Sequence, residues 1–293
     1  MHVTLEYHKK VVAILVGILA LLLILLGIMF IRDFTIKKAS EKYLQGEEVV
    51  IIKSAGGDGD VILPIKKVLF EYIEIVDSCG PYFDVACLNA RSGPGEDYPI
   101  VTKLRRGIVL KVGGKVERDN KTWYKIIFDE WIRYPERVTG DFYVAADYVQ
   151  VLLDEGNKDL TPATKPANIT KKIIVSRTEQ KLYAYDGDQL FMEQVISTGL
   201  ELTPTPKGTF TIFKKTPSRY MQGPIPGITE KYYDLPGVPW NLYFTYDGAV
   251  IHGTYWHENF GKPSSNGCIN LPPARAYELY KWTDVGTPVI VRD

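Results

Sequence analysis

A cysteine in a glycine turn, with a histidine a short distance upstream, indicates chemistry more directly than any other part of this sequence. Cys268 follows Gly267 in an uncharged run, and His252 precedes it by sixteen positions. The thiolate is the nucleophilic form of cysteine, and a neighbouring imidazole is the usual base that forms it. Two of the four histidines lie within the first ten residues, so His252 and His257 are the candidate bases. A buried structural cysteine beside a loop histidine is the alternative, because free cysteines are mostly inert.

Short strands joined by tight turns would position this pair. Asp-Gly turns separate residues 181–185 from 190–196, and residues 242–246 from 249–252. Such turns between alternating apolar runs predict two β-hairpins. His252 would then lie at the end of a strand, where a rigid backbone can aim its ring.

One short helix is expected after the cysteine. Pro273 suits a first helical turn, and Ala276, Leu279 and Tyr280 would share one face. Pro272 leaves the helix without a side-chain cap at its start.

A long segment between the predicted hairpins, residues 216–240, is rich in proline and glycine and has no period of its own. It carries Arg219, Tyr220, Tyr232 and Tyr233. A long loop near a catalytic pair is a candidate substrate lid.

A series of motifs surrounds Cys268 and His252: Ile174-Val175, Gln180 to Tyr183, Ser197 to Gly199, Thr203 to Phe210, His252 to Asn270 and Gly286 to Val289. In order and spacing they resemble the catalytic domain of the L,D-transpeptidases (YkuD type) of bacterial cell walls. The resemblance covers about residues 170 to 293. One position departs from the family: Asn266 stands where histidine is usual. Asparagine cannot relay a proton, although it can still make an orienting hydrogen bond.

The predicted mechanism is acyl transfer through a thioester. Cys268 attacks a peptide carbonyl, and His252 takes the thiol proton and later protonates the leaving amine. The N–H groups of Gly267 and Cys268 would form the oxyanion hole, since glycine lets the backbone approach the substrate oxygen. The carbonyl of Gly253 is the expected acceptor that orients His252.

The resemblance implies that the donor is a peptidoglycan stem tetrapeptide, cut before its terminal D-Ala, and that the acceptor is the side-chain amine of a neighbouring stem. No cofactor and no metal are expected, because His257 and Glu258 lack a third ligand at metal spacing. The side chains expected to bind substrate are Ser265, Asn266, Asn270, Tyr233, Trp256, Arg219 and Tyr220.

Other functions stay open at this stage. An L,D-carboxypeptidase would use the same residues with water as the acceptor. The chain could also be an inactive wall-binding anchor, in which Asn266 reflects the loss of catalytic activity, although Cys268, His252 and Gly267 are intact. A papain-like hydrolase would place the cysteine before the histidine, and the order here is the reverse.

An uncharged run of 21 residues, Val11 to Ile31, dominates the N-terminal region. It is long enough to cross a bilayer as a helix, and no Ala-x-Ala pattern follows it, so an uncleaved membrane anchor is expected. A soluble core helix is disfavoured by the length of the run. Basic residues flank both ends, so charge does not decide the orientation. The resemblance implies a cytoplasmic tail of residues 1–10 and an extracytoplasmic catalytic domain.

The charge balance excludes one class of partner. Lys and Arg together equal Asp and Glu, at 35 each. A nucleic-acid binder needs a basic surplus for phosphate contacts, so no nucleic acid is expected. The expected partners are stem peptides, the cell wall, and the lipid bilayer through residues 11–31.

The remaining domain boundaries follow from changes in composition. Residues 32–65 are expected to form a juxtamembrane spacer of uncertain order. Residues 154–169 are polar and contain prolines, so they are expected to form an interdomain linker before the catalytic domain of residues 170–293. Residues 66–153 show short β-branched and aromatic runs between Gly and Pro turns, which describe a small barrel and resemble a bacterial Src-homology-3-like (SH3-like) domain. The expected fold is therefore mainly β: a transmembrane helix, a small SH3-like β-barrel, and a β-sandwich-like catalytic domain with one short helix.

Two features of the barrel segment carry further expectations, and a third expectation concerns the catalytic domain alone. Tyr98, Trp123 and Tyr124 are expected to pack in its core and rim rather than to form a sugar platform. Cys79 and Cys87 flank a Gly-Pro turn, and either a disulfide or two reduced core cysteines fit that spacing. Every residue assigned to chemistry lies in 170–293, so that fragment alone is expected to acylate at nearly the full-length rate.

Overall fold

The computed structural model describes residues 49–52, 61–68, 71–138, 140–153 and 170–293. They divide into two units, residues 1–66 and 67–293. The predicted membrane span, residues 11–31, and the predicted linker, residues 154–169, lie outside the described residues. Within the described ranges, no helix combines the length and the apolar character that crossing a bilayer requires.

The first unit contains an antiparallel hairpin that was not predicted. Strand β1 (Val49–Ile52) pairs with β2 (Val61–Pro64). Both strands consist mostly of β-branched and other apolar residues, which favour extended backbone. The expected spacer of residues 32–65 therefore includes a structured element.

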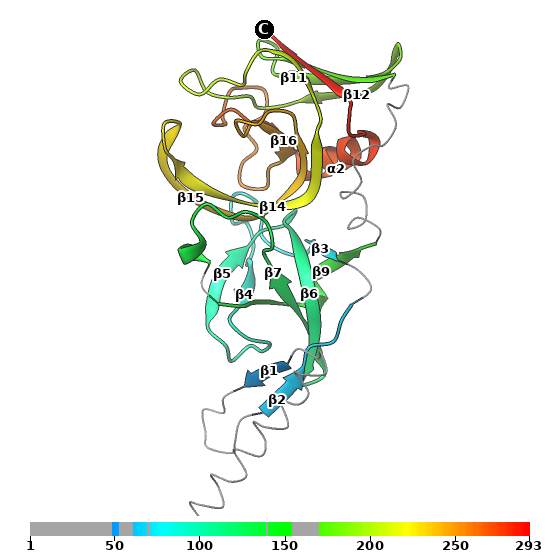
Figure 1. Cartoon of the computed structure of the whole chain (residues 1–293). Coiled ribbons are helices and arrows are strands. Elements are labelled where there is room, and N and C mark those ends of the chain that lie inside the picture. Colours follow the sequence, from blue (N-terminus) through cyan, green and yellow to red (C-terminus); the bar gives the residue numbers. More distant parts are fainter. Residues whose placement is uncertain (1–48, 53–60, 69–70, 139, 154–169) are drawn as a thin grey trace, which may run out of the picture. The chain divides into compact units, whose positions relative to one another are not determined.

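The second unit begins with the predicted small β-domain, most of whose strands are labelled in Figure 1. Its strands form one sheet in the order β5-β4-β8-β7-β6-β3-β9. Trp123 and Tyr124 are buried in it and Tyr98 is half-buried, which confirms that they pack rather than form an exposed platform. The elements are β3 (Tyr72–Ile75), β4 (Leu88–Arg91), β5 (Ile100–Leu104), β6 (Val109–Arg118), β7 (Lys121–Ile127), β8 (Phe142–Ala145) and β9 (Val149–Leu152), with short 3-10 helices η1 (Pro135–Arg137) and η2 (Ala146–Tyr148).

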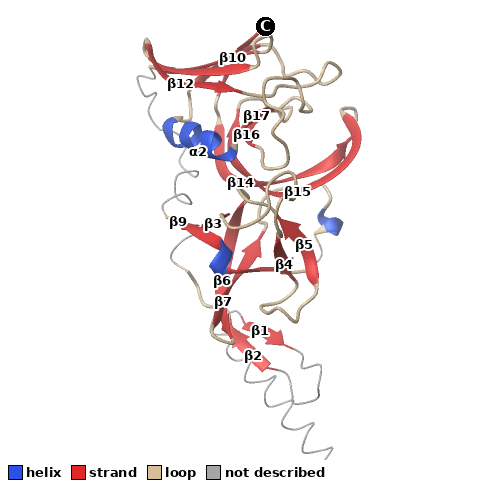
Figure 2. Ribbon diagram, turned by 180° about the vertical axis from the view of Figure 1, so that it is seen from behind, coloured by secondary structure: helices blue, strands red, loops and turns tan. Residues whose placement is uncertain are grey.

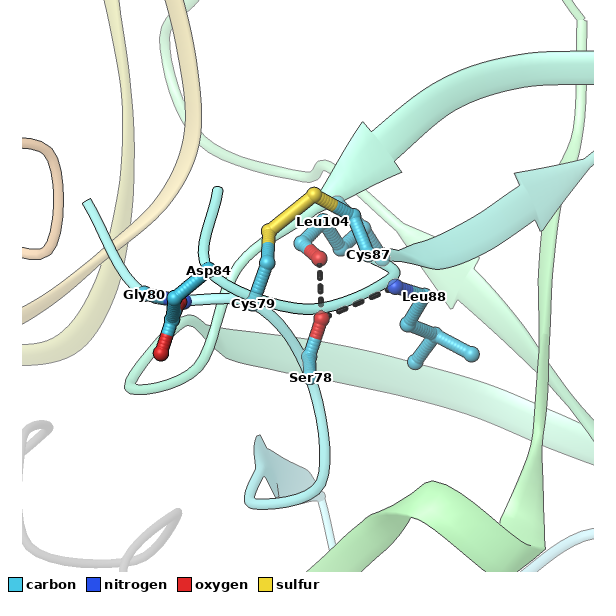
Figure 3. The surroundings of a disulfide bond; sticks show 7 residues. All are labelled: Ser78, Cys79, Gly80, Asp84, Cys87, Leu88 and Leu104. Atoms are coloured by element: carbon cyan, nitrogen blue, oxygen red, sulfur yellow. Dashed lines mark hydrogen bonds between the residues drawn. A yellow bond between two sulfur atoms is a disulfide. The ribbon is translucent and has the colours of Figure 1, made fainter. Parts of the chain in front are cut away.

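A disulfide joins Cys79 to Cys87, whose Cα atoms lie 4.6 Å apart. Figure 3 shows how Ser78 fixes the adjoining backbone: its Oγ donates to the carbonyl of Leu104 (2.6 Å) and accepts from the N–H of Leu88 (2.8 Å). The bridge closes a short loop in the connection between β3 and β4. Of the two alternatives left open by the spacing, the structure has the disulfide.

We expect the double variant Cys79→Ser/Cys87→Ser to lose roughly 2 to 3 kcal/mol of unfolding free energy, because the bridge closes a loop of eight residues and restricts the unfolded chain. Urea unfolding monitored by circular dichroism measures the loss. A reducing agent should destabilise the wild type by the same amount and leave the double variant unchanged. Equal stability of wild type and variant would contradict the prediction.

The catalytic region contains two sheets and one α-helix. The sheets have the strand orders β12-β11-β10-β18-β13 and β14-β15-β16-β17, and Figure 2 shows the helix α2 beside the second of them. The elements are β10 (Lys171–Ser176), β11 (Lys181–Asp186), β12 (Gln189–Val195), β13 (Gly208–Thr211), β14 (Lys214–Ile225), β15 (Thr229–Tyr243), β16 (Val250–Gly253), β17 (Ile269–Leu271), α2 (Pro273–Trp282) and β18 (Pro288–Arg292).

Both hairpins and the helix predicted from the sequence are confirmed. β11 pairs with β12 across the first Asp-Gly turn, and β15 pairs with β16 across the segment that contains the second Asp-Gly turn. The helix buries Ala276, Leu279 and Tyr280 and has no side-chain hydrogen bond at its N-cap, Pro272.

The prediction of a long loop over residues 216–240 is wrong. This segment forms most of the β14–β15 hairpin. The prolines of this segment disfavoured strands in the sequence analysis, because proline has no N–H to donate to a neighbouring strand. The pairing register shifts between Arg219 and Met221 and between Gly223 and Ile225, and the second shift accommodates Pro224.

The hairpin also joins the catalytic region to the barrel. Val238 of β15 and Tyr255 belong to the same buried cluster as the barrel core, and Ser218 Oγ donates to the carbonyl of Val109 at 2.6 Å. Gly237 has a φ of +66°, and a Cβ there would lie 2.5 Å from the Val109 oxygen. The two domains therefore share a close interface, and the expectation of a freely separable catalytic domain has to be revised.

Candidate active site

Pairing of two short strands brings the cysteine and the histidine together. β16 and β17 run parallel, with His252 opposite Asn270. Cys268 directly precedes β17, and extending the register places it beside Val250. Because side chains alternate along a strand, Cys268, Asn270, Val250 and His252 share one face of this pair.

His252 is held in one orientation. Its side chain is 1% exposed, and Nδ1 lies 2.9 Å from the carbonyl oxygen of Gly253. A carbonyl only accepts, so Nδ1 carries the proton of the neutral ring and Nε2 carries the lone pair. Nε2 is buried without a hydrogen-bond partner among the described residues. This nitrogen is therefore available as a base.

Burial keeps both members of the pair neutral at rest. Desolvation lowers the pKa of His252 to about 4, with smaller contributions from the charges of Arg219 and His257. Desolvation raises the pKa of the Cys268 thiol, while Arg219 and a backbone hydrogen bond from Val250 oppose that rise. Its Sγ lies 3.8 Å from the carbonyl oxygen of Gly248. The thiolate would thus form by proton transfer to the imidazole as the reaction proceeds.

The pKa of His252 makes stability depend on pH. Between its ordinary value of 6.5 and about 4, the unfolded protein binds a proton that the folded protein does not. Burial of the neutral His252 ring therefore contributes fully to the free energy of unfolding above about pH 6.5. This contribution is lost as the pH falls toward 4, and the loss is on the order of 3 kcal/mol. Urea unfolding of wild type and His252→Gln at pH 7.5 and pH 4.5 measures it. A wild-type loss no larger than that of the variant would contradict the prediction.

The nucleophile turn depends on a glycine and on a serine hydroxyl. Gly267 has a φ of +109°, which L side chains rarely adopt. Its N–H donates to Ser265 Oγ (3.2 Å), and that hydroxyl donates to the carbonyl of Cys268 (2.6 Å). Ser265, expected to bind substrate, is buried and its hydroxyl holds the turn instead. The Gly267 N–H predicted for the oxyanion hole also makes this internal contact.

Residues distant in the sequence support that turn. Asn270 and Ser197 exchange backbone hydrogen bonds. The side chain of Gln180 both donates to Thr198 Oγ1 (2.6 Å) and accepts from the Thr198 N–H (2.9 Å), and the Thr198 carbonyl accepts from the N–H of Ser265. The motifs that carry the family resemblance are therefore the scaffold of the nucleophile turn.

His257 lies in a separate network beside the pair. The Asn259 N–H donates to Nδ1 of His257 (3.1 Å), and Nε2 of the same ring lies 3.0 Å from Nδ2 of the Asn270 side chain. Trp256 is half-buried, with its ring centroid 5.8 Å from that of His252. His257 therefore orients Asn270, while His252 is the better-placed base.

The residues of the β14–β15 hairpin that were expected to bind substrate lie either against the barrel or near Cys268. Tyr220, expected to contact substrate, is buried against the barrel, with its ring centroid 4.9 Å from that of Phe128. Tyr233 lies over Gly223, where a Cβ would collide with its ring, and desolvation and the charge of Cys268 raise its pKa to about 12. Arg219 also acts electrostatically on Cys268. Arg219 and Tyr233 thus remain candidates for substrate contact, as does the half-buried Asn266.

One residue that sequence reasoning missed belongs to the barrel. Glu130 Oε1 accepts a hydrogen bond from the Tyr220 N–H at 2.6 Å. Desolvation raises the pKa of Glu130 to about 7. Ninety positions separate the two residues in the sequence, and no local sequence pattern predicts a contact between them. As for metals, no group of three or more His, Cys, Asp or Glu residues within the described ranges could hold an ion.

Comparison with known proteins gives matches to both domains. A profile of the L,D-transpeptidase catalytic domain matches residues 170–291, and a bacterial SH3 domain profile matches residues 87–150. YkuD of Bacillus licheniformis, assigned as an L,D-transpeptidase, is 30% identical over 129 residues, which are 43% of this chain and 68% of the relative. YqjB of Bacillus subtilis, with the same assignment, is 27% identical over 130 residues, 41% of this chain and 70% of the relative.

Solved structures also match. A crystal structure of a cysteine-to-serine mutant of an Enterococcus faecium L,D-transpeptidase is 28% identical, with a TM-score of 0.39; the match covers 42% of this chain and 50% of that one. This chain thus spans about half the length of that protein. An L,D-transpeptidase from Mycobacterium smegmatis is 21% identical, with a TM-score of 0.41, over 59% of this chain and 91% of that one. Since these TM-scores are low, the sequence matches carry the assignment.

Proposed function

This chain belongs to the L,D-transpeptidase family, and from that premise we propose that it cross-links peptidoglycan stem peptides through a thioester on Cys268. The family is one of acyltransferases, so the chain is an enzyme of that class. One observation supports the residue assignment: Nδ1 of His252 donates to the Gly253 carbonyl, and Nε2, which has no partner among the described residues, lies on the sheet face that bears Cys268.

In the first half-reaction, Sγ of Cys268 attacks the carbonyl carbon of the donor peptide bond, and the thiol proton passes to Nε2 of His252. The tetrahedral intermediate collapses, the C–N bond breaks, and the imidazolium protonates the departing amine. The products are a thioester and a free amino acid. Because His252 is buried, its charged form is costly, which favours rapid return of the proton to the leaving group.

In the second half-reaction, an amine of a neighbouring stem attacks the thioester carbonyl. Nε2 of His252 takes a proton from that amine, the C–S bond breaks, and the imidazolium returns the proton to the departing sulfur, so that the Cys268 thiol and the neutral imidazole re-form. With water in place of the amine the same steps give hydrolysis. The donor is proposed to be a stem tetrapeptide cut before its terminal D-Ala.

The protein is proposed to act outside the cytoplasmic membrane, anchored through residues 11–31. The Cys79–Cys87 disulfide supports this location, because disulfides persist in oxidising compartments and are rare in the cytosol. The SH3-like domain is proposed to position the catalytic domain at the wall. Every residue given a role in chemistry lies in the extracytoplasmic part of this arrangement.

Mass spectrometry of muropeptides incubated with the purified chain lacking its first 31 residues tests the proposed function. We expect a cross-linked dimer accompanied by release of D-Ala. A trimmed monomer alone would identify a carboxypeptidase. Unchanged muropeptides, with a folded protein and a reactive thiol, would indicate an inactive wall-binding protein.

A further inference from the structure

One hydrogen-bond donor of Arg219 is unused among the described residues. Its Nη1 is buried and has no hydrogen-bond partner among the described residues. Its guanidinium lies over the ring of Tyr243, with Cζ 5.5 Å from the ring centroid. Leaving a charged donor buried and unpaired is unfavourable, and a guanidinium N–H can be satisfied only by an acceptor. The arrangement therefore indicates an acceptor that the protein itself does not supply.

The groups around Arg219 are mostly neutral. Its charge acts on Cys268, His252, Tyr233 and Tyr243, which are all uncharged at neutral pH. It also acts on Glu130, whose carboxylate already accepts from the Tyr220 N–H. The guanidinium thus lies within electrostatic range of the nucleophile, and the surrounding catalytic groups do not neutralise it.

The barrel holds this arginine in place. The register of the β14–β15 ladder shifts between Arg219 and Met221, and the intervening Tyr220 directs its N–H to Glu130 instead of to β15. The ring of Tyr220 packs edge-on against Phe128 of the same barrel segment. Tyr220 is thus anchored on the barrel side, while the guanidinium of the preceding Arg219 lies over Tyr243 and acts on Cys268.

We propose that Arg219 binds the terminal carboxylate of the donor peptide, and that Glu130 is a positioning residue that holds Arg219 for this contact. The proposal rests on the proposed function, because it concerns the residue that the first half-reaction releases. Guanidinium groups bind carboxylates through paired, charge-assisted hydrogen bonds. A carboxylate bound there would select donors in which the scissile bond is the last one of the stem.

The test compares two donors that differ in one group: a stem tetrapeptide with a free terminal carboxylate and the same peptide with a terminal amide. The kcat/KM of wild type should favour the acid by about 10- to 100-fold, which a charge-assisted hydrogen bond supplies. In Arg219→Gln this ratio should fall to near one, and Arg219→Lys should retain part of it. The ratio is informative even if a variant lowers both rates by changing the Cys268 pKa.

The positioning role of Glu130 has its own variants. Glu130→Ala removes the acceptor for the Tyr220 N–H and should lower the acid-to-amide ratio, mainly through KM for the acid. Glu130→Gln keeps an acceptor oxygen and should restore most of the ratio. Asp129→Asn, a change at the exposed neighbouring carboxylate that pairs with Lys111, is the matched control and should leave the ratio unchanged.

The outcomes separate this proposal from the proposed function. A wild type that uses acid and amide donors equally would overturn the carboxylate subsite while leaving the transpeptidase assignment intact. A wild type that uses neither donor would count against the proposed function. A ratio that survives in Arg219→Gln would overturn the role of Arg219, and a ratio unchanged in Glu130→Ala would overturn that of Glu130.

Discussion

Cys268→Ala is expected to abolish acylation entirely, because the chain has no other free thiol within the described residues. The wild type should gain the mass of a carbapenem-type β-lactam, a thioester-forming probe that the family resemblance implies, and the variant should gain none. Intact-protein mass spectrometry after timed incubation measures this. Cys268→Ser is the control for packing, since it retains a small polar side chain while its hydroxyl is a much weaker nucleophile than a thiol. A covalent adduct on the alanine variant would show that another group is the nucleophile.

The two histidines should differ sharply in the same assay. His252→Ala removes the buried base and should slow acylation by roughly 10²- to 10⁴-fold, the usual contribution of a general base. His257→Ala removes only the group that orients Asn270 and should cost about tenfold or less. Equal losses in both variants would mean that His257 takes part in the proton transfer. Circular dichroism of each variant serves as the folding control.

Removing the barrel should damage the catalytic domain, contrary to what the location of the chemical residues indicates. A fragment of residues 170–293 would expose Val238 and Tyr255, which are buried with the barrel core. Uncovering two such side chains costs on the order of 3 to 5 kcal/mol, a large part of the stability of a typical domain. It would also remove Glu130, the acceptor for Tyr220. We expect a lower melting temperature and slower acylation.

Residues 67–293, which keep the barrel, are the reference for this comparison. Melting followed by circular dichroism and the rate of carbapenem acylation should both separate the two fragments. If the shorter fragment melts at the same temperature and acylates at the rate of the longer one, the interface contributes nothing, and the simple modular arrangement indicated by the sequence holds.

Local sequence patterns were sufficient for several elements. The Asp-Gly turns at residues 186–187 and 247–248 predicted two hairpins, because few backbone conformations connect tightly paired strands and glycine adopts them readily. The apolar spacing after Pro273 predicted α2 with its buried face. Cys268, Gly267 and His252 were identifiable from residue chemistry and spacing. Such features depend on interactions within a few residues, and these are readable along the chain.

The β14–β15 hairpin was not predictable in the same way. Its prolines and glycines have the composition of a loop, yet register shifts and a sheet partner accommodate them. Pairing between β14 and β15 stabilises extended backbone that local propensity does not favour. Whether such a segment is a loop or a hairpin is therefore decided by its long-range partner.

The sequence alone was sufficient to predict which groups would do the chemistry, because the thiol and the imidazole are intrinsic to single residues and their family motifs are local. Only the tertiary structure decided what each neighbouring side chain does. Arg219 and Tyr220 are adjacent, yet the guanidinium of Arg219 acts on Cys268, whereas Tyr220 packs against Phe128 and its N–H donates to Glu130. Ser265 could have met substrate or backbone, and its hydroxyl is used within the turn. Such roles depend on partners up to ninety positions away, which meet only when the chain has folded.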